Sequence, residues 1–295
     1  MLVHFISVGQ GDAIAINFPD GKVMLIDAGP TSSNVSYTTY LNEKVLNNKR
    51  DKKIDYFVMT HSDADHIGGA LRLLENFDVE TIYLPVVTED TASFTQLYNC
   101  IYNHDYNLIS SVDASAIRQS DYVIEFFGPV DLEDENDSCQ IVRIEYMSYS
   151  FIFTGDISST VEQKYVETYG ELLDSDVLKV PHHGSKYSSS INFLEAVSPK
   201  YAVISCGYNT YGHPTSEAIS NLSSVGANVL RTDNDGNILF TVGNYYALDL
   251  KTGTYSITGS NLDYRILIIV IDGVLIFCAV KQMIVAKRRE IRKYK

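Results

Sequence analysis

The chain has 295 residues, of which 45% are hydrophobic and 20% are charged, a composition typical of a globular protein with one large or two small domains. Residues 1–264 carry 15 Lys and Arg against 35 Asp and Glu, a net charge of −20, whereas residues 265–295 carry +6. So acidic a body argues against non-specific nucleic-acid binding through charge alone. The four cysteines form no C-x-x-C pair, which argues against a disulfide scaffold and a thiolate zinc site.

The first part of the chain is predicted to alternate strands, turns and helices. An Asp-Gly pair at Pro19–Gly21 indicates a hairpin, and Gly9–Asp12 separates the first two strands. The expected strands are Val3–Val8, Ala13–Phe18, Val23–Ile26, Ile54–Met59 and Thr81–Pro85, and the expected helices are Tyr37–Asn47, a segment around Leu71–Leu74, and Phe94–Asn103.

The run THSDADHIGG at residues 60–69 follows the buried strand Ile54–Met59 and precedes a helix. It places His61, Asp63, Asp65 and His66 within six positions on a loop, where binding residues concentrate. Two carboxylates and two imidazoles would pack badly in an apolar core, but they suit a divalent cation. The alternative is a polar loop with chance His and Asp residues.

The later part of the chain has the same mixed character, after an acidic loop at Asp131–Asp137. We expect strands at Tyr122–Phe127, Gln140–Tyr146, Tyr149–Phe153, Val177–Val180, Tyr201–Ser205 and Val229–Arg231, helices at Ser159–Tyr169, Ile191–Val197 and Ser216–Ser224, and a last hairpin of Asn237–Val242 with Tyr245–Leu250. This order predicts two packed sheets with helices on their outer faces.

Further metal-competent residues follow predicted strands, at the sheet edge where α/β sites assemble. Asp27 alone could fix a turn, and Asp156 could cap the helix near Ser159. Together these residues indicate a metal site more specifically than any one of them does alone. They are Asp27, Asp156, His182, His183 and His213.

The motifs THSDADHIGG, TGD, VPHHGS and YGHP, with VHFISVGQGDA and LIDAGP, resemble the metallo-β-lactamase superfamily, and within it the ComEC-like branch of competence-protein hydrolase domains. The resemblance covers about residues 2–250. It implies an α/β fold, a four-layer αβ/βα sandwich with the site in a cleft at one edge of the two sheets. Ser7 stands where this branch usually has Asp, the third-motif His is missing near Asn136–Cys139, and the multi-span transport channel is absent, so DNA import is not implied.

The resemblance also implies two divalent metal ions, Zn or Mn. His61 and Asp63 would hold the first, Asp65, His66 and His213 the second, and Asp156 would bridge them. Asp27 would orient a ligand histidine. The first ion lacks a ligand, which His182, His183 or water could supply; either histidine could instead pass a proton to the leaving group, and both are counted with Asp65 as catalytic.

The function implied is a metal-dependent hydrolase, first a phosphodiesterase or nuclease that uses a dimetal-activated hydroxide. The alternatives are a lactonase or another hydrolase of C–O or C–N bonds, or a membrane-associated component of DNA uptake with weak chemistry. The expected partner is a phosphodiester or another small hydrolysable substrate, with nucleic acid possible as a substrate. The oligomeric state is left open.

The expected organisation is a hydrolase domain at residues 1–250, a polar linker at 251–264 and a hydrophobic, then basic, segment at 265–295. Ile266–Val280 is apolar except for Asp272, and the basic tail favours a membrane anchor, either spanning or interfacial; the alternative is an element packed on the domain. A spanning segment would place its basic tail in the cytoplasm and the acidic domain outside. No signal peptide is visible for such export, so the alternative is an interfacial helix on the cytoplasmic face, with the rest of the chain cytoplasmic.

Overall fold

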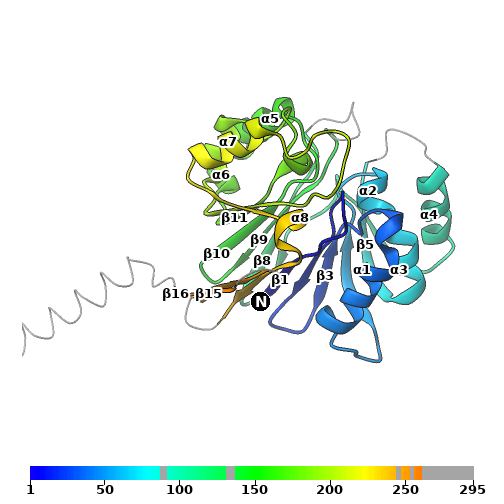
Figure 1. The fold of residues 1–295 in the computed structure, drawn as a ribbon. Helices are drawn as coiled ribbons and strands as arrows, with labels where there is room; N and C mark the ends of the chain where they lie inside the picture. Colours follow the sequence, from blue (N-terminus) through cyan, green and yellow to red (C-terminus); the bar gives the residue numbers. More distant parts are fainter. Residues whose placement is uncertain (87–91, 131–136, 244–246, 253–255, 261–295) are drawn as a thin grey trace, which may run out of the picture.

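The computed structural model describes residues 1–86, 92–130, 137–243, 247–252 and 256–260. Two mixed sheets face each other, and helices cover their outer sides (Figure 1). The predicted layers of helix, sheet, sheet and helix are therefore confirmed. The predicted C-terminal hydrophobic helix and basic tail at 265–295 lie outside the described residues. Across the described ranges, no helix combines the length and the apolar character that crossing a membrane requires.

The first sheet follows the order β16-β15-β14-β1-β2-β3-β4-β5-β6. Its strands β3 to β6 run parallel to one another, so their carboxyl ends share one edge. The strands are β1 (Leu2–Phe5), β2 (Ile14–Asn17), β3 (Val23–Ile26), β4 (Lys53–Val58), β5 (Asp78–Leu84), β6 (Asn107–Ser110), β14 (Ile238–Val242), β15 (Ala247–Lys251) and β16 (Ser256–Ser260).

The second sheet follows the order β13-β12-β11-β10-β9-β8-β7, and its strands β10 to β13 are parallel. Strand β10 is buried along its whole length, as its apolar run predicts for the centre of a covered sheet. The strands are β7 (Ile117–Arg118), β8 (Tyr122–Phe127), β9 (Ile141–Tyr146), β10 (Tyr149–Phe153), β11 (Val177–Lys179), β12 (Tyr201–Ile204) and β13 (Asn228–Arg231).

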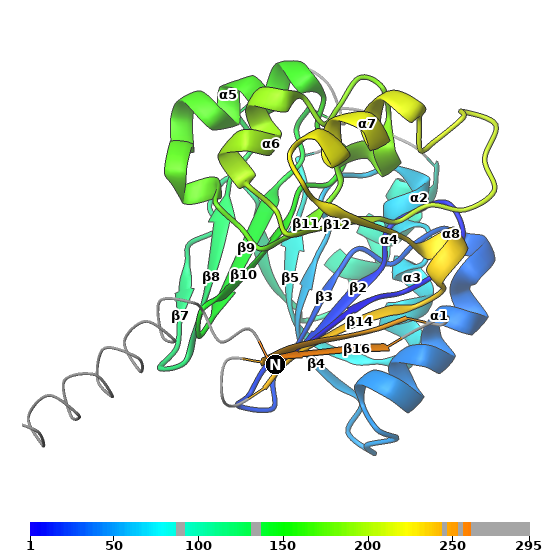
Figure 2. The same cartoon turned by 60° about the vertical axis from the view of Figure 1, so that its left-hand side comes forward.

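The helices fall into two groups, one outside each sheet, as the turned view shows (Figure 2). Ser190 and Thr215 begin α6 and α7 with side chains that accept backbone N–H bonds. The helices are α1 (Asn34–Tyr40, continued by the wider turn η2, Leu41–Val45), α2 (Ala64–Ile67), α3 (Ala70–Asn76), α4 (Ala92–Tyr102), α5 (Ser159–Tyr169), α6 (Ile191–Val197), α7 (Ser216–Ser224) and α8 (Thr232–Asp235), with single turns η1 (Thr31–Ser33), η3 (Gly170–Leu173) and η4 (Pro181–Gly184).

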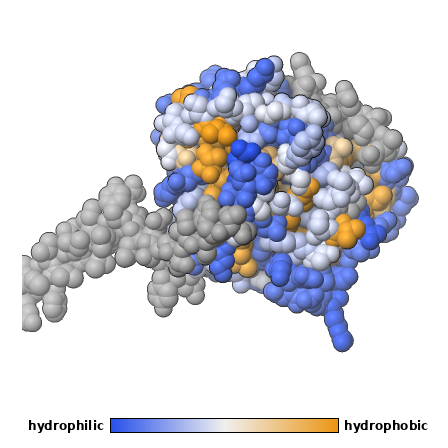
Figure 3. Space-filling model, in the orientation of Figure 1, coloured by the Kyte–Doolittle hydropathy of each residue, from blue (hydrophilic) through white to orange (hydrophobic). Residues whose placement is uncertain are grey.

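Three apolar clusters hold these layers together. One lies between the sheets and includes Phe5, Phe153 and Phe240. A second lies between the first sheet and helices α1, α3 and α4, and a third between the second sheet and helices α5, α6 and α7. The face seen in Figure 3 is mainly hydrophilic, and its hydrophobic side chains form small separate groups. Apolar side chains thus fill each of the three interfaces between the four layers.

The sequence does not predict β6, β7 or β16. Part of the segment expected to be a linker, residues 251–264, forms β16, which pairs antiparallel with β15 and extends the last hairpin into a third strand. The β-prone residues within Ser256–Ser260 allow this pairing, although the surrounding Thr, Gly and Ser residues suggest a linker.

Glu162 is a fully buried carboxyl on α5 that accepts the backbone N–H groups of Ser189 and Ser190, just before α6. Burial raises its pKa from 4.5 to about 7, against these hydrogen bonds. The folded state therefore holds this proton more tightly than the unfolded chain does. Its contribution to stability is full below pH 4.5 and is lost as the pH rises from 4.5 to 7.

We compare the unfolding free energy of the wild type with that of Glu162→Gln. The wild-type value minus the variant value should fall by up to about 3 kcal/mol between pH 4.5 and 7.5. Urea denaturation at several pH values measures this difference. Glu167→Gln, an exposed change on the same helix, is the matched control and keeps a constant difference. A pH-independent difference for Glu162→Gln would contradict the buried-carboxyl account.

Candidate metal centre

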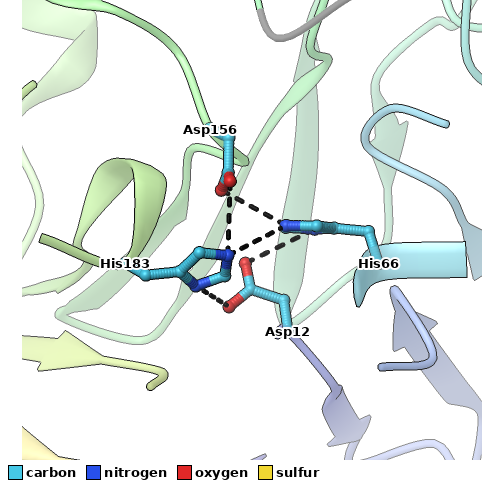
Figure 4. A group of neighbouring side chains, drawn as sticks. All are labelled: Asp12, His66, Asp156 and His183. Atoms are coloured by element: carbon cyan, nitrogen blue, oxygen red, sulfur yellow. Dashed lines mark hydrogen bonds and ion pairs between the residues drawn. The ribbon is translucent and has the colours of Figure 1, made fainter. Parts of the chain in front are cut away.

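Four buried side chains from distant parts of the chain converge at the common edge of the two sheets (Figure 4). Asp12 comes from the loop between β1 and β2, His66 from α2, Asp156 from the turn after β10, and His183 from η4. One ligand atom from each lies within 4.8 Å of the others. The carboxyl ends of parallel strands explain this convergence, because both sheets present them at this edge.

The imidazoles are held by acceptors behind them. Nδ1 of His66 lies 2.7 Å from Oδ2 of Asp27, the residue expected to orient a ligand histidine. Nδ1 of His183 lies 2.8 Å from the carbonyl oxygen of Ser205, which can only accept, so Nδ1 carries the proton and Nε2 keeps its lone pair. Both rings are therefore fixed with Nε2 facing the cavity, as in metal-binding histidines.

The Nε2 atoms of His66 and His183 lie only 3.3 Å apart. Oδ1 of Asp156 is 3.3 Å from the first and Oδ2 is 3.2 Å from the second. Two imidazole lone pairs that face each other beside a carboxylate need a cation or a proton between them. Nε2 of His61 is also buried and has no hydrogen-bond partner among the described residues. This donor set of nitrogen and carboxylate oxygen fits a divalent metal ion.

Electrostatics lead to the same conclusion. Although burial opposes charge on the ring, Asp156 and Asp27 hold the pKa of His66 well above its usual value. Asp156 similarly raises the pKa of His183 to about 9, against burial. Burial opposes ionisation of Asp156 itself, but His183, His66 and Lys179 keep its pKa well below the ordinary range. The site is thus rich in negative charge, which favours cations.

The backbone places the two adjacent histidines differently. Both His182 and His183 have left-handed backbone conformations, with φ of 49° and 51°. Two backbone hydrogen bonds hold this turn: the N–H of His182 donates to the Gly155 carbonyl, and the N–H of Thr215 donates to the Gly184 carbonyl. As a result, the ring of His183 points into the donor cluster, whereas that of His182 lies 5.5 Å from the ring of His213.

The remaining predicted residues surround one cavity of about 190 Å³. Oδ2 of Asp63 lies 3.5 Å from Nε2 of His61, and Oδ2 of Asp65 lies 3.2 Å from Nε2 of His183. His183 therefore joins the group of Asp65, His66 and Asp156, in which the resemblance implied His213. The cavity is lined by Asp63, Asp65, Asp156, His182, His183, His213, Gln10 and Tyr211.

Cys139 occupies the stretch where the third-motif histidine is missing. Its Sγ accepts the backbone N–H of Asp156 at 3.3 Å, and its thiol is fully buried, which raises its pKa well above the usual value. A Cβ on Gly155 would come within 2.8 Å of this sulfur, and Gly155 has a φ of +57°. This stretch therefore positions the backbone of Asp156 through a tight turn that only glycine fits well.

Two residues of the centre, Asp12 and Lys179, are missed by the sequence reasoning. Lys179 is 1% exposed; its Nζ contacts Asp12, lies 3.3 Å from Oδ1 of Asp156 and donates to the Gly155 carbonyl. The oxygens of Asp12 lie 3.7 Å from Nδ1 of both His66 and His183, on the side of the rings away from Nε2. Asp12 thus completes the converging group from the Nδ1 side of the two rings, and Lys179 contacts both Asp12 and Asp156.

The sequence contains a feature that could have identified each of these two residues, Asp12 and Lys179. In the sequence, Asp12 ends a Gly-Gln-Gly-Asp loop that follows a predicted strand. In the structure, a Cβ on Gly11 would lie 2.2 Å from the Asp65 carbonyl oxygen, so this loop packs directly on the metal motif. Lys179 is a lone charge in the apolar run Val177–Val180, and a buried charge requires a partner.

Comparison with known proteins gives a family and several relatives. The sequence profile of the Metallo-beta-lactamase superfamily matches residues 6–208. The chain is 31% identical over 271 residues to ComE operon protein 3 of Bacillus subtilis, covering 86% of this chain and 34% of that protein. It is 33% identical over 201 residues to competence protein ComA of Neisseria gonorrhoeae, covering 67% of this chain and 27% of that protein. The chain thus spans about a third or less of these relatives.

Solved structures with low sequence identity share the fold. Igni18, a metallo hydrolase from Ignicoccus hospitalis, matches with a TM-score of 0.54 at 19% identity, over 82% of this chain and all of that one. The metallo-beta-lactamase fold protein YhfI from Bacillus subtilis matches with a TM-score of 0.51 at 15% identity, over 81% of this chain and 99% of that one. At these identities the likeness concerns the fold alone.

We expect the purified chain to bind divalent cations, up to two per chain, because buried nitrogen and oxygen donors face one cavity. His66→Ala and Asp156→Ala should each weaken binding at least roughly tenfold. Calorimetric titration with Mn²⁺ and Zn²⁺, supported by elemental analysis, measures this. His104→Ala removes an exposed histidine on another part of the surface and is the control. Absence of metal uptake by the wild type would refute the metal centre.

We expect Lys179→Met to lower the unfolding free energy by about 3–5 kcal/mol, because it leaves Asp12 and Asp156 as buried charges without this partner. Lys200→Met is the matched control: Lys200 is exposed, its Nζ is 2.8 Å from Oδ1 of Asp176, and its loss should cost about 0–1 kcal/mol. Urea denaturation of both variants with EDTA present measures the difference. Equal stability of the two variants would show that Lys179 does not hold the carboxylates.

Proposed function

The chain belongs to the metallo-β-lactamase superfamily, and we propose that it is a metal-dependent hydrolase that cleaves phosphodiesters. The observation that carries this proposal is the pair of Nε2 atoms of His66 and His183, 3.3 Å apart and bracketed by the carboxylate of Asp156. The relative named competence protein ComA supports a substrate related to nucleic acid.

Two divalent cations, which we propose as Mn²⁺ or Zn²⁺, would be held by two groups of donors in the same cavity. His61 and Asp63 form one group, and Asp65, His66 and His183 form the other. Asp156, which lies 3.3 Å from His66 and 3.2 Å from His183, would bridge the two cations. Bound there, the cations would polarise a phosphoryl oxygen and lower the pKa of water to near neutrality. The hard carboxylate Asp63, in place of an imidazole, favours Mn²⁺ at the first position.

The chain's own residues prepare the site before any substrate arrives. Thr60 ties the motif together: its N–H and hydroxyl donate to the two oxygens of Asp27, which leaves Asp27 in place to hold the ring of His66. His183, His66 and Lys179 lower the pKa of Asp156 against its burial, and Nζ of Lys179 lies 3.3 Å from its Oδ1. Donors fixed in this way need little rearrangement during the reaction, which is the main contribution of a preorganised site.

His182 is the residue best placed to move a proton. It lines the cavity beside Asp156 and His183 without belonging to the group of four converging donors. Burial lowers its pKa, so its ring is neutral at pH 7 and can take up a proton. His213 faces it, and burial lowers the pKa of that ring too. We therefore assign His182 to proton exchange with the attacking water or the leaving oxygen.

The test is turnover of bis-p-nitrophenyl phosphate, oligonucleotides, a lactone and a β-lactam by the full chain loaded with Mn²⁺ or Zn²⁺. We expect the phosphodiesters to be hydrolysed, Asp65→Ala and Asp156→Ala to abolish this, and His182→Ala to reduce kcat by roughly two to four decades with unchanged metal content. His104→Ala should behave as the wild type.

Two results would change the assignment. Turnover of the lactone or β-lactam alone would overturn the phosphodiesterase proposal in favour of a C–O or C–N hydrolase. Loss of metal in His182→Ala would make His182 a ligand in place of the missing third-motif histidine, rather than a proton carrier.

A further inference from the structure

The metal centre lies between two larger hollows. The 190 Å³ cavity shares His182 and His213 with a hollow of about 510 Å³, and it shares Gln10 and Asp65 with another of about 750 Å³. Tyr211 lines all three. The reacting position is therefore open on two sides. A phosphodiester carries an organic group on each side of its phosphorus, whereas a monoester carries one, so this arrangement suits a diester.

The two hollows differ in charge. The smaller one, here called the lysine lobe, includes Lys186, Tyr187, Ser185 and Thr215, and no carboxylate lines it among the described residues. The larger one includes Tyr208 and Thr31, and Asp65 is its only charged side chain within the part of the chain described. On a chain with a net charge of −14, the lysine lobe is thus the side on which a second phosphate meets a cation rather than a carboxylate.

Aromatic rings stand beside the lysine. Nζ of Lys186 lies 4.9 Å from the centre of the Tyr187 ring, a cation–π distance that holds the ammonium at the lobe. Tyr187 and Tyr211 are 66% and 75% exposed, so each ring still presents an exposed surface on which a planar group can stack, although Lys186 lies over the Tyr187 ring. Exposed aromatic rings next to cations are the usual means of holding bases of single-stranded nucleic acid.

Building on the proposed function, we propose that the substrate is a short oligonucleotide that places its cleaved linkage at the metal centre and the neighbouring phosphate and base in the lysine lobe. Lys186 contacts that phosphate and Tyr187 stacks on that base. The acidic remainder of residues 1–264 restricts recognition to these few units, because it repels a longer phosphate backbone. Lys186 and Tyr187 are thus specificity-determining residues outside the metal centre.

The experiment compares the thymidine dinucleotides TpT, pTpT and TpTp as substrates of the metal-loaded full chain. We expect one of the two phosphorylated forms to have a higher kcat/KM than TpT, by roughly two- to fivefold. Lys186→Met should bring this ratio toward one, and Tyr187→Ala should raise KM for that preferred form at least roughly fivefold. Lys44→Met and Tyr102→Ala, exposed changes on other parts of the surface, should keep the wild-type ratio and KM.

Binding separates this inference from the proposed function. Dissociation constants are measured by calorimetry for the same dinucleotides with a methylphosphonate linkage, which resists hydrolysis. If the protein hydrolyses bis-p-nitrophenyl phosphate but has the same kcat/KM for all three dinucleotides, the proposed role of the lysine lobe is wrong. The phosphodiesterase proposal is then still supported. If no phosphodiester is hydrolysed, the proposed function fails. A binding preference for the extra phosphate that Lys186→Met removes would still support the lobe, and equal binding would overturn it.

Discussion

Negative charge gathered on largely buried side chains is the constraint on which this site depends. Carboxylates approach one cavity from several parts of the chain, and most of them are buried: Asp12, Asp27, Asp63, Asp65 and Asp156. Such a group repels itself strongly unless cations, protons or hydrogen bonds compensate each member. Lys179 contacts two of them, and the pKa values of His66 and His183 are raised by the neighbouring carboxylates, against burial.

The same constraint explains the layer behind the donors. Each imidazole is tied at Nδ1, His66 to a carboxylate, His183 to a backbone carbonyl, and His61 to the hydroxyl of Thr60 at 3.0 Å. These ties lie in loops that follow β3, β4 and β12, so the sheets set the ring orientations. The donors of such a metal centre are preorganised because the groups that hold them stand at strand ends.

The sequence predicts features formed by residues close together in the chain, but not those formed by contacts between distant segments. His61 to His66 lie within six positions, so spacing alone indicates a metal motif, and the alternation of strands and helices indicates the layers. Asp12 is different, because its role depends on a loop folding onto α2 from more than fifty residues away. The choice between His182 and His183 depends on a left-handed backbone that adjacent identical residues do not reveal. Strand β16 was not predicted because the polar residues around it in the sequence are typical of a linker.

The converging donor group lies wholly inside the family match, whereas part of the lining of the hollows lies beyond it. Side chains of the converging donor group come from positions 12–183, inside the matched residues 6–208, and their geometry follows from the shared arrangement of strand ends. Tyr211, His213 and Thr215, which shape the hollows, lie beyond that match. Loops of this kind vary while the scaffold stays constant. The fold therefore accounts for the metal centre, and in the proposed function the loops around Lys186 and Tyr211 are the parts of this chain that would select the substrate.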